Sequence, residues 1–450
     1  MITFLWDSSV IVKAREFIKD MFKNKPKPVV TNSPYRTSKP RVLTTDNGIK
    51  LRIESLIGSG GQGEVYRAFF DGNAEPVALK LFYRSQSTTV TKERIRFLVK
   101  KRLDQIDRGI CAPFDTITGN GLVGHIAPFA HGKTLLEFLE EGSLSYSEVY
   151  AVALQIVDLV RTLIEHGIIQ GDLQTQNIKL HRTRQGIYLY MIDFDNYSAV
   201  GAKKPSMLGM TLYIAPELRK KRKNANNQIP TEYTDRFSLG VLMHEVLLHF
   251  HPIAGFDETV DDINASMVSN WKYDPSLPNT PKNPHGYPVS TLNPELTAML
   301  RRSLSPMQQS RPSYKEWQQA LETASANLLI CENCGIPMVN YMGRTKCPSG
   351  HHIQRHILRL DSHNEIYISG MVSVLGRREL GGSSAISGNH IVIREIGSQL
   401  YVEAIGMNPT YIRQNGSWRS LVPNKLIQLK PNDQLMVADR PIQYKTLMNE

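Results

Sequence analysis

Residues 167–195 contain three oxygen-bearing side chains whose types and spacing favour a shared metal ion. Asp172 is followed five residues later by Asn177, and Asp193 stands at the end of an apolar run. Mg²⁺ is a hard cation that prefers carboxylate and amide oxygens and is usually shared with substrate phosphates. These residues therefore predict a magnesium site beside a phosphate-bearing substrate.

A small β-hairpin is the element that must bring these side chains together. Residues 178–180 and 188–192 are short β-type segments, and Gln185 and Gly186 between them favour a turn. Asn177 would then stand at the start of the hairpin and Asp193 at its end. Upstream, residues 145–166 have a long helical periodicity that delivers the chain to Asp172.

A glycine-rich turn near residue 60 is a candidate phosphate-binding loop. Glycines let backbone N–H groups approach a triphosphate closely, because no Cβ intervenes. Alone, such a turn is also compatible with a dinucleotide-binding fold or a plain glycine-rich hairpin. The next apolar strand, however, ends at Lys80, and a lysine is costly to bury there unless it meets an anion. The turn carries Gly58, Gly60, Gly63 and Val65.

Together these motifs resemble those of the protein kinases. The resemblance implies that Asp172 is the catalytic base and that Asn177 and Asp193 hold Mg²⁺. It also implies that Lys80 binds the α- and β-phosphates of ATP and pairs with a glutamate of the next helix, for which Glu93 is the candidate. Gly58, Gly60, Gly63 and Val65 would cover the nucleotide.

Later segments extend the resemblance over residues 48–328. Residues 209–217 are similar to the kinase segment that receives the peptide substrate. By the family pattern, Glu217 pairs with Arg311, and Asp235 fastens the catalytic loop from below. Ser313 begins a capping box that predicts a last helix reaching about residue 329. The expected fold of this part is the α+β, two-lobed kinase fold.

Five residues around the centre depart from the kinase pattern, but none of them removes a metal ligand. Without an arginine before the base, no partner exists for an activation-loop phosphate. We therefore expect an active bacterial-type serine/threonine kinase acting on a protein substrate, and the alternative is a pseudokinase scaffold that binds nucleotide and recruits phosphoproteins. The departures are Gln170 and Gly171 for His-Arg, Gln174 for Lys, Asp195 for the Gly of DFG, and Met210 for Thr.

Residues 329–355 are a candidate zinc-ribbon-like module. Cys331, Cys334 and Cys347, with His351 or His352 as the fourth ligand, have the spacing of a structural zinc site. Zinc would allow so short a segment to fold without much of a core. The alternative is a set of buried free cysteines.

Residues 356–450 have short alternating segments and turn signals that predict an all-β sandwich. Within them Arg377, Ser387, His390 and Asn408 stand in an order that resembles a forkhead-associated (FHA) domain, a module that binds phosphothreonine. The resemblance implies that Arg377, Ser387 and Asn408 bind the phosphate and that His390 supports their loop.

Two departures qualify this second resemblance. Gly388 stands where Arg or Lys is common, and Pro409 stands where Gly is common. Arg378 could replace Arg377, and a sandwich without a phosphate site is the alternative. The expected partner is a phosphothreonine-bearing protein, either this chain or another. Kinases with such tails also resemble members of signalling clusters that hold a phosphatase and a von Willebrand-type protein.

Composition sets the remaining expectations. The 450 residues are 41% apolar and 21% charged, as in globular multidomain proteins. Ten of the basic residues and only four acidic ones fall in the first fifty positions, so residues 1–47 are interpreted as a basic flexible arm rather than a nucleic-acid site. Its opening apolar run is too short to span a membrane and lacks a secretory cleavage site, which favours a cytoplasmic protein. The arm's predicted accessible hydroxyls include Thr31, Thr37, Thr44 and Thr45.

Overall fold

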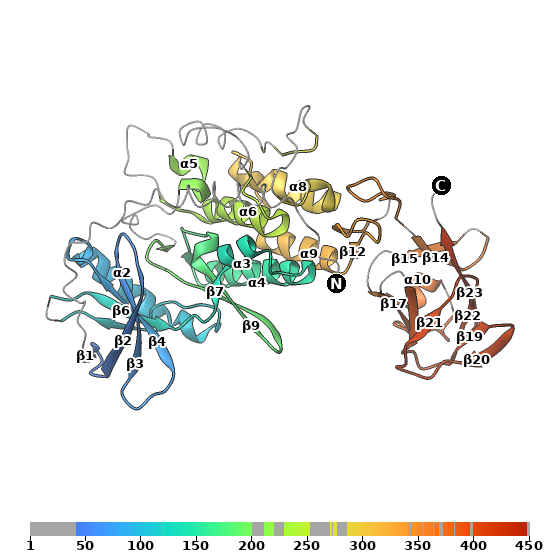
Figure 1. The fold of residues 1–450 in the computed structure, drawn as a ribbon, viewed down its shortest axis with the longest axis horizontal. Coiled ribbons are helices and arrows are strands. Elements are labelled where there is room, and N and C mark those ends of the chain that lie inside the picture. Colours follow the sequence, from blue (N-terminus) through green and yellow to red (C-terminus); the bar gives the residue numbers. More distant parts are fainter. Residues whose placement is uncertain are drawn as a thin grey trace. The chain divides into compact units, whose positions relative to one another are not determined.

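The computed structural model describes most of the chain from residue 42 to residue 447 (Figure 1). The chain divides into two compact units. The first consists of Met1–Tyr287 and Met299–Gln318, and the second consists of Pro288–Ala298 and Gln319–Glu450. The described residues are 42–119, 121–199, 211–219, 229–252, 271, 273–276, 286–341, 344–353, 355–362, 364–368, 372–381, 383–396 and 399–447.

The first unit begins with a six-stranded antiparallel sheet in the order β1-β2-β3-β4-β6-β5. Leu51, Leu79 and Ile126 are fully buried against it, because alternate residues of each strand point to the same face. Its strands are β1 (Val42–Thr44), β2 (Lys50–Ser59), β3 (Gly63–Phe70), β4 (Pro76–Phe82), β5 (Asp115–Ile117) and β6 (Gly124–Pro128).

The start of this sheet corrects part of the prediction for the basic arm. Thr44 lies in β1, which pairs with β2, so the last residues assigned to the arm are ordered sheet. Thr45 is buried, and its hydroxyl accepts a hydrogen bond from the backbone N–H of Ile49, so it is not an accessible hydroxyl. The remainder of the predicted arm, residues 1–41, lies outside the described residues.

One long helix, α2 (Thr89–Lys101), follows the fourth strand of the sheet (Figure 1). Thr88 caps its N-terminus by accepting a hydrogen bond from the N–H of Thr91, and Arg102 ends it in the left-handed conformation. Ile95 and Leu98 are its buried residues, so the helix has one apolar side.

The following part of the chain is mainly helical. In α4, Ser145 and Glu148 form a capping box, and buried residues recur every three or four positions, as the periodicity predicts. In α6 nearly every residue from Thr234 onward is buried, which marks a central helix. The helices are α3 (Leu135–Glu141), α4 (Tyr146–Glu165), α5 (Pro216–Arg219), α6 (Glu232–Leu248), α8 (Pro294–Ser303) and α9 (Tyr314–Ser325).

The hairpin predicted between Asn177 and Asp193 is confirmed. β9 and β10 pair antiparallel, with Thr183 opposite Gly186, and both strands are longer than predicted. The predicted capping box at Ser313 is also present, but α9 ends at Ser325 rather than near 329. The short strands here are β7 (Lys133–Thr134), β8 (Ile168–Ile169), β9 (Ile178–Thr183), β10 (Gly186–Met191) and β11 (Ser198–Ala199).

The helix ends early because the chain turns into β12 (Leu328–Ile330), which pairs with β13 (Pro337–Val339) in the second unit. This hairpin carries the cysteine-containing segment. Arg344, which is 6% exposed, ties the segment to residues 288–298 by donating hydrogen bonds to the carbonyls of Ser290 and Leu292, both at 2.7 Å.

The rest of the second unit consists of two antiparallel sheets that enclose one apolar core. The sheet orders are β15-β14-β23-β22-β19-β20 and β16-β17-β18-β21, and their inward residues include Ile393, Val402, Ile412 and Leu435. The elements are β14 (Arg355–Arg359), β15 (Glu365–Ile368), β16 (Val372–Leu375), α10 (Arg377–Leu380), β17 (Ile391–Ile396), β18 (Gln399–Ala404), β19 (Thr410–Gln414), β20 (Ser417–Ser420), β21 (Ile427–Leu429), β22 (Gln434–Val437) and β23 (Arg440–Leu447).

No helix within the described residues is long and apolar enough to cross a lipid bilayer. Met210 and much of the segments at 200–228 and 253–285 lie outside the described residues.

Candidate active site

The loop at residues 170–177 is fixed by one buried carboxylate from α6. Asp235, 1% exposed, accepts hydrogen bonds from the backbone N–H groups of Gln170 at 2.7 Å and Gly171 at 3.0 Å. Burial raises the pKa of Asp235 to about 7, and the two backbone hydrogen bonds act in the opposite direction. The predicted fastening role of Asp235 therefore has a direct structural basis.

Gly171 is required by the shape of this loop. Its φ of +74° is costly for any residue with a Cβ, and a Cβ there would lie 2.6 Å from the carbonyl oxygen of Asn196. The position where kinases usually have arginine is therefore held by the one residue that fits this close approach.

Three amide groups surround the carboxylate of Asp172. Gln174 Nε2 donates to Oδ1 at 2.7 Å, whereas Asn177 Nδ2 and Asn196 Nδ2 donate to Oδ2 at 3.1 and 3.2 Å. Asp172 is 8% exposed, so its orientation is fixed by these contacts.

Asn177 contacts this carboxylate, and Asp193 follows the hairpin that begins after Asn177. Asn177 uses its amide nitrogen on Asp172, so the amide oxygen is the atom suited to a cation. The Asp193 side chain is 39% exposed, and its backbone has a φ of +58°. Gln170 Nε2 donates to the backbone carbonyl of Asp193 at 3.3 Å, which joins the loop at residues 170–177 to the end of the hairpin. The donor set fits Mg²⁺.

One row across the sheet places Lys80 at this centre. Val65 on β3, Lys80 on β4 and His125 on β6 are directly opposite one another, and Gly58 on β2 is opposite Val65. Directly opposite residues project from the same face of an antiparallel sheet, so this row shares one face.

Lys80 forms ion pairs with two carboxylates. Its Nζ lies 3.0 Å from Oδ1 of Asp193 and also pairs with Oδ2 of Asp195. Burial acts to lower the pKa of Lys80, but the two carboxylates outweigh burial and raise it. His125 Nε2 lies 3.4 Å from the other oxygen of Asp195.

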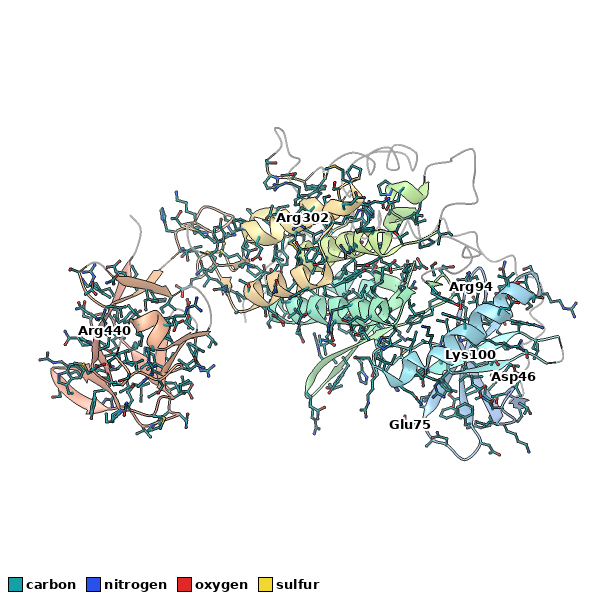
Figure 2. The ribbon with its side chains drawn as sticks, turned by 180° about the vertical axis from the view of Figure 1, so that it is seen from behind. Asp46, Glu75, Arg94, Lys100, Arg302 and Arg440 are labelled. Atoms are coloured by element: carbon teal, nitrogen blue, oxygen red, sulfur yellow. The ribbon has the colours of Figure 1, made fainter. Side chains whose placement is uncertain are left out.

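The predicted pair between Lys80 and Glu93 is not formed. Glu93 is exposed, and within the described part of the chain it makes no ion pair. The neighbouring position, Arg94, reaches the site instead, because its Nη2 donates to the carbonyls of Asp195 and Tyr197, both at 2.7 Å. Figure 2 labels Arg94 together with Lys100 of the same helix.

The glycines of the turn differ in what surrounds them. A Cβ on Gly58 or Gly60 would meet nothing within 4 Å, which leaves open space above the site. At Gly63 a Cβ would lie 2.2 Å from the carbonyl oxygen of Leu81, so this glycine is needed for the close approach of β3 and β4.

The segment that ends in Glu217 is anchored from two sides. Arg311, 1% exposed, holds the Glu217 carboxylate by two hydrogen bonds of 2.7 and 2.9 Å, as predicted. The hydroxyl of Tyr213 donates to Glu245 of α6 at 2.5 Å and lies 3.3 Å from Oγ1 of Thr175 in the loop.

A family model described as "Protein kinase domain" matches residues 51–323. The chain belongs to the protein kinase family. It is 27% identical over 212 residues to serine/threonine-protein kinase 36 of Pongo abelii, covering 45% of this chain and 15% of that protein. It is 24% identical over 225 residues to human calcium/calmodulin-dependent protein kinase type IV, covering 50% of this chain and 45% of that protein.

A bacterial relative is also similar. The probable serine/threonine-protein kinase pknA2 of Bifidobacterium longum is 26% identical over 207 residues, which is 44% of this chain and 26% of that protein. The chain thus spans less than half the length of each of these three relatives.

Outside the kinase domain, the structure brings together the four residues predicted to bind zinc. One ligand atom from each of Cys331, Cys334, Cys347 and His351 lies within 4.8 Å of the others. Cys334 Sγ and Cys347 Sγ lie 3.8 Å apart, close to the separation of about 3.8 Å that two tetrahedral Zn–S bonds require. His351 Nδ1 lies 3.8 Å from Cys331 Sγ and 3.4 Å from Cys347 Sγ. His352 is exposed, and its backbone forms an isolated β-bridge with that of Lys346. Both facts favour His351 as the fourth ligand.

The thiol of Cys334 is predisposed to ionise. Burial acts to raise its pKa, but hydrogen bonds from the Ile336 amide and from His351 lower it to about 6. A thiolate is the form of cysteine that binds metal.

Two of the three predicted phosphate-binding residues of the C-terminal sandwich, Ser387 and Asn408, stand on neighbouring loops, and Arg377 begins the short helix α10. Arg377 and Asn408 are exposed and donate to carbonyls of the 383–387 loop, Arg377 Nε to Ile386 at 2.9 Å and Asn408 Nδ2 to Ala385 at 2.7 Å. Ser387 Oγ accepts from the N–H of Met407 at 3.1 Å, so its own hydrogen is left to donate.

His390 braces the two loops from beneath. It is fully buried, its Nδ1 accepts from the N–H of Ser387 at 2.9 Å, and its Nε2 lies 3.0 Å from the carbonyl of Asn408. A Cβ on Gly406 would come within 2.5 Å of the imidazole, so glycine is needed there. This bracing matches the supporting role that the family pattern implies for His390.

Sequence reasoning missed three residues of the kinase centre. Asn196 donates to the base, Arg94 ties α2 to the loop after Asp193, and His125 faces Asp195. No motif marks them. Only the strand register, which puts His125 opposite Lys80, could have pointed to one of the three.

The buried Glu245 predicts a measurable pH dependence of stability. Burial raises its pKa to about 8, which the hydrogen bond from Tyr213 only partly offsets. Because this exceeds the value of 4.5 for an exposed glutamate, the folded state binds more protons between these pH values, and stability falls as pH rises. Asp235 acts in the same direction. His244 and His249, whose pKa values burial lowers to about 3 and about 4, act in the opposite direction below their ordinary value of 6.5. We therefore expect the free energy of unfolding to decrease from about pH 6.5 to pH 8.

Glu245→Gln should flatten this decrease, since the maximal slope from one such group is about 1.4 kcal/mol per pH unit. Urea denaturation at several pH values measures the slope. Glu295→Gln, which changes an exposed carboxylate at the start of α8, is the matched control. An unchanged slope in Glu245→Gln would show that Glu245 is ionised in the folded protein throughout this range.

Proposed function

We propose that this chain is an ATP-dependent serine/threonine protein kinase that transfers the γ-phosphoryl group to a protein hydroxyl. The observation that carries the proposal is the convergence of Asp172, Asn177, Asp193 and Lys80. Phosphoryl transfer depends on positioning and charge stabilisation, and these four groups are the ones that such a site needs. The names of the relatives agree with this activity.

Asp172 would orient the substrate hydroxyl and accept its proton. The three amides keep the carboxylate in one orientation without giving it a full counter-charge. Gln174 supplies one of these amides where kinases usually have lysine, so the site holds less positive charge near the transferred phosphoryl group. A lower rate of transfer is the expected consequence.

Bound Mg²⁺ would bridge the nucleotide phosphates and neutralise their charge. Asn177 through its amide oxygen and Asp193 through its carboxylate would hold the ion. Lys80 would contact the α- and β-phosphates, and the open space at Gly58 and Gly60 leaves room for the triphosphate.

Activation by a phosphate on the activation loop is not part of this proposal. The position before the base is Gly171, which cannot bind a phosphate through a side chain and whose φ excludes arginine without strain. Control of activity would instead come from partner binding.

The cysteine-containing segment would hold a structural zinc ion. Its donor set of three sulfurs and one nitrogen closes a tetrahedron and leaves no open position for catalysis. Such a site would stabilise the segment, whose apolar cluster contains little besides Met338 and Ile353.

The C-terminal sandwich would act as a forkhead-associated domain that binds phosphothreonine. Arg377 offers a charged donor, and Ser387 and Asn408 offer neutral ones, on loops that His390 holds in place. The ligand would be a phosphothreonine of this chain, for example at Thr31 or Thr37, or of a partner such as a phosphatase or a von Willebrand-type protein.

The first prediction concerns catalysis. Asp172→Asn should reduce incorporation of labelled phosphate from ATP and Mg²⁺ by at least about 100-fold, because general-base contributions are of that order. Asp158→Asn, which changes an exposed carboxylate on α4, should leave the rate unchanged. If the unaltered protein binds nucleotide but incorporates no label into itself or a generic substrate, the pseudokinase alternative is correct.

The second prediction concerns the metal. Purified protein should contain about one zinc ion per chain by elemental mass spectrometry, and Cys334→Ser should lower this to well below one. Cys111→Ser provides a matched control, because Cys111 is a buried free thiol outside the cluster. Absence of zinc from protein expressed with zinc would contradict the proposed site.

The third prediction concerns phosphopeptide binding. Arg377→Ala should weaken binding of a phosphothreonine peptide library by about 10-fold or more, because a hydrogen bond to a charged group is worth about 1.5–3 kcal/mol. Arg413→Ala, on the exposed side of β19, is the control, and Arg378→Ala tests the alternative arginine. Equal binding of phosphorylated and unphosphorylated peptides would show that the sandwich has no phosphate site.

A further inference from the structure

We propose that Asp195 replaces the usual glutamate of α2 as the anion that positions Lys80, and that α2 is coupled to this pair through Arg94. Asp195 stands where kinases usually have glycine. The inference deepens the proposed kinase function, on which it rests, by naming a positioning residue of the same site. It is derived from the contacts of four side chains: Lys80, Asp195, His125 and Arg94.

Asp195 is enclosed between two basic side chains. Its side chain is 6% exposed, Lys80 pairs with one carboxylate oxygen, and His125 Nε2 lies 3.4 Å from the other. A carboxylate so enclosed is fixed in position and remains available to Lys80.

The α2 helix offers Lys80 no carboxylate of its own. Its single acidic residue is Glu93, which is exposed. The side of the helix that faces Asp195 carries Thr91, Arg94, Ile95 and Leu98, at the spacing of one helical face. Glu93 lies about 100° around the helix from Arg94, so it is directed away from that face.

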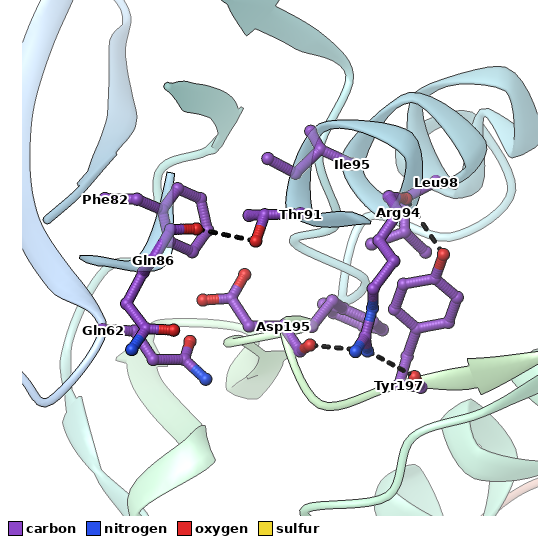
Figure 3. Close-up of a pocket in the computed structure, with 10 residues that line it drawn as sticks. Gln62, Phe82, Gln86, Thr91, Arg94, Ile95, Leu98, Asp195 and Tyr197 are labelled. Carbon is purple, nitrogen blue, oxygen red and sulfur yellow. Dashed lines mark hydrogen bonds between the residues drawn. The ribbon is translucent and has the colours of Figure 1, made fainter. Parts of the chain in front are cut away.

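A pocket occupies the space between α2 and Asp195 (Figure 3). Gln62, Gln86 and Arg94 are among its lining residues. Figure 3 shows the Asp195 side chain on the same side of the pocket as the side-chain amides of Gln62 and Gln86, and the Asp195 backbone carbonyl is directed to Arg94.

Arg94 provides the mechanical link that the missing ion pair would have supplied. Its guanidinium donates to the carbonyls of Asp195 and Tyr197, and the Tyr197 hydroxyl donates back to the Arg94 carbonyl at 2.9 Å. The guanidinium also lies 5.0 Å from the centre of the Tyr197 ring. A displacement of α2 would therefore move the backbone of Asp195, and with it the anion that holds Lys80.

This arrangement separates two tasks between neighbouring carboxylates. Asp193 is 39% exposed and can bind Mg²⁺, whereas Asp195 is enclosed and serves Lys80. When a cation engages Asp193, Lys80 keeps Asp195 as its partner and stays directed toward the nucleotide. Without Asp195, Lys80 and Mg²⁺ would compete for one carboxylate.

The first test needs neither nucleotide nor activity. Lys80 is labelled with acetic anhydride in the full-length protein, and the labelled peptide is quantified by mass spectrometry. Asp195→Asn should increase Lys80 labelling by about tenfold, because loss of a charge-assisted hydrogen bond frees the amine by that order. Glu93→Gln should leave the labelling unchanged. Equal Lys80 labelling in Asp195→Asn and the unaltered protein would overturn the inference.

Asp195→Glu keeps the carboxylate and should restore most of the protection of Lys80. If Asp195 had only a structural role, keeping the carboxylate would not restore this protection. This variant also serves if Asp195→Asn is poorly folded, as judged by circular dichroism. In that case, Lys80 labelling of Asp195→Glu as high as that of urea-unfolded protein would overturn the inference.

The second test measures the affinity for a fluorescent ATP analogue with Mg²⁺. Asp195→Asn should weaken binding by about tenfold, and the double variant with Lys80→Met should bind no more weakly than Lys80→Met alone, because Asp195 acts through Lys80. Additive losses would overturn the inference. If the labelling result holds but no phosphoryl transfer is found, the kinase activity fails and the positioning role of Asp195 stands.

Discussion

The geometry of the kinase centre depends on a carboxylate that is almost completely removed from water. Asp235 holds two consecutive backbone N–H groups, those of Gln170 and Gly171, and thereby fixes the loop on which Asp172 stands. Burying the charge is costly, as the raised pKa of Asp235 indicates, and only the two hydrogen bonds offset that cost. The left-handed backbone at Gly171 and the hydrogen bond of Gln170 to Asp193 follow from this one constraint.

With the loop so fixed, three amides orient the base. Gln174, Asn177 and Asn196 all donate to the carboxylate of Asp172. Gln174, which stands where kinases usually have lysine, orients the carboxylate but brings no net charge to the site. The chain therefore keeps the position of the base and gives up part of the electrostatic stabilisation near the phosphoryl group.

Local patterns in the sequence correctly predicted the hairpin of the kinase centre but not the long-range contacts around it. Asp172, Asn177 and Asp193 could be predicted because a short hairpin determines their neighbourhood. Glu93 was wrongly predicted to pair with Lys80, because nothing in the sequence sets the rotation of α2 relative to the sheet. His125 depends on strand register, which a sequence does not state.

The same limit applies at the edges of the fold. Thr45 has the composition of a linker around it, yet the pairing of β1 with β2 buries it. His351 and His352 are neighbours in the sequence, and only the fold shows that the imidazole of His351 lies beside the three sulfurs whereas the backbone of His352 pairs with Lys346. In both cases the deciding fact is a long-range or cross-strand contact, which residue spacing alone does not reveal.

In the proposed kinase centre, burial would decide which of two nearby carboxylates binds Mg²⁺. Asp193 and Asp195 have the same side chain and both contact Lys80, but the first is partly open to solvent and the second is enclosed by Lys80 and His125. A metal ion that keeps several waters can reach only the open carboxylate. The departure from glycine at Asp195 thus does not add a second metal ligand. It supplies the buried counter-charge that α2, which carries arginine at the facing position, does not provide.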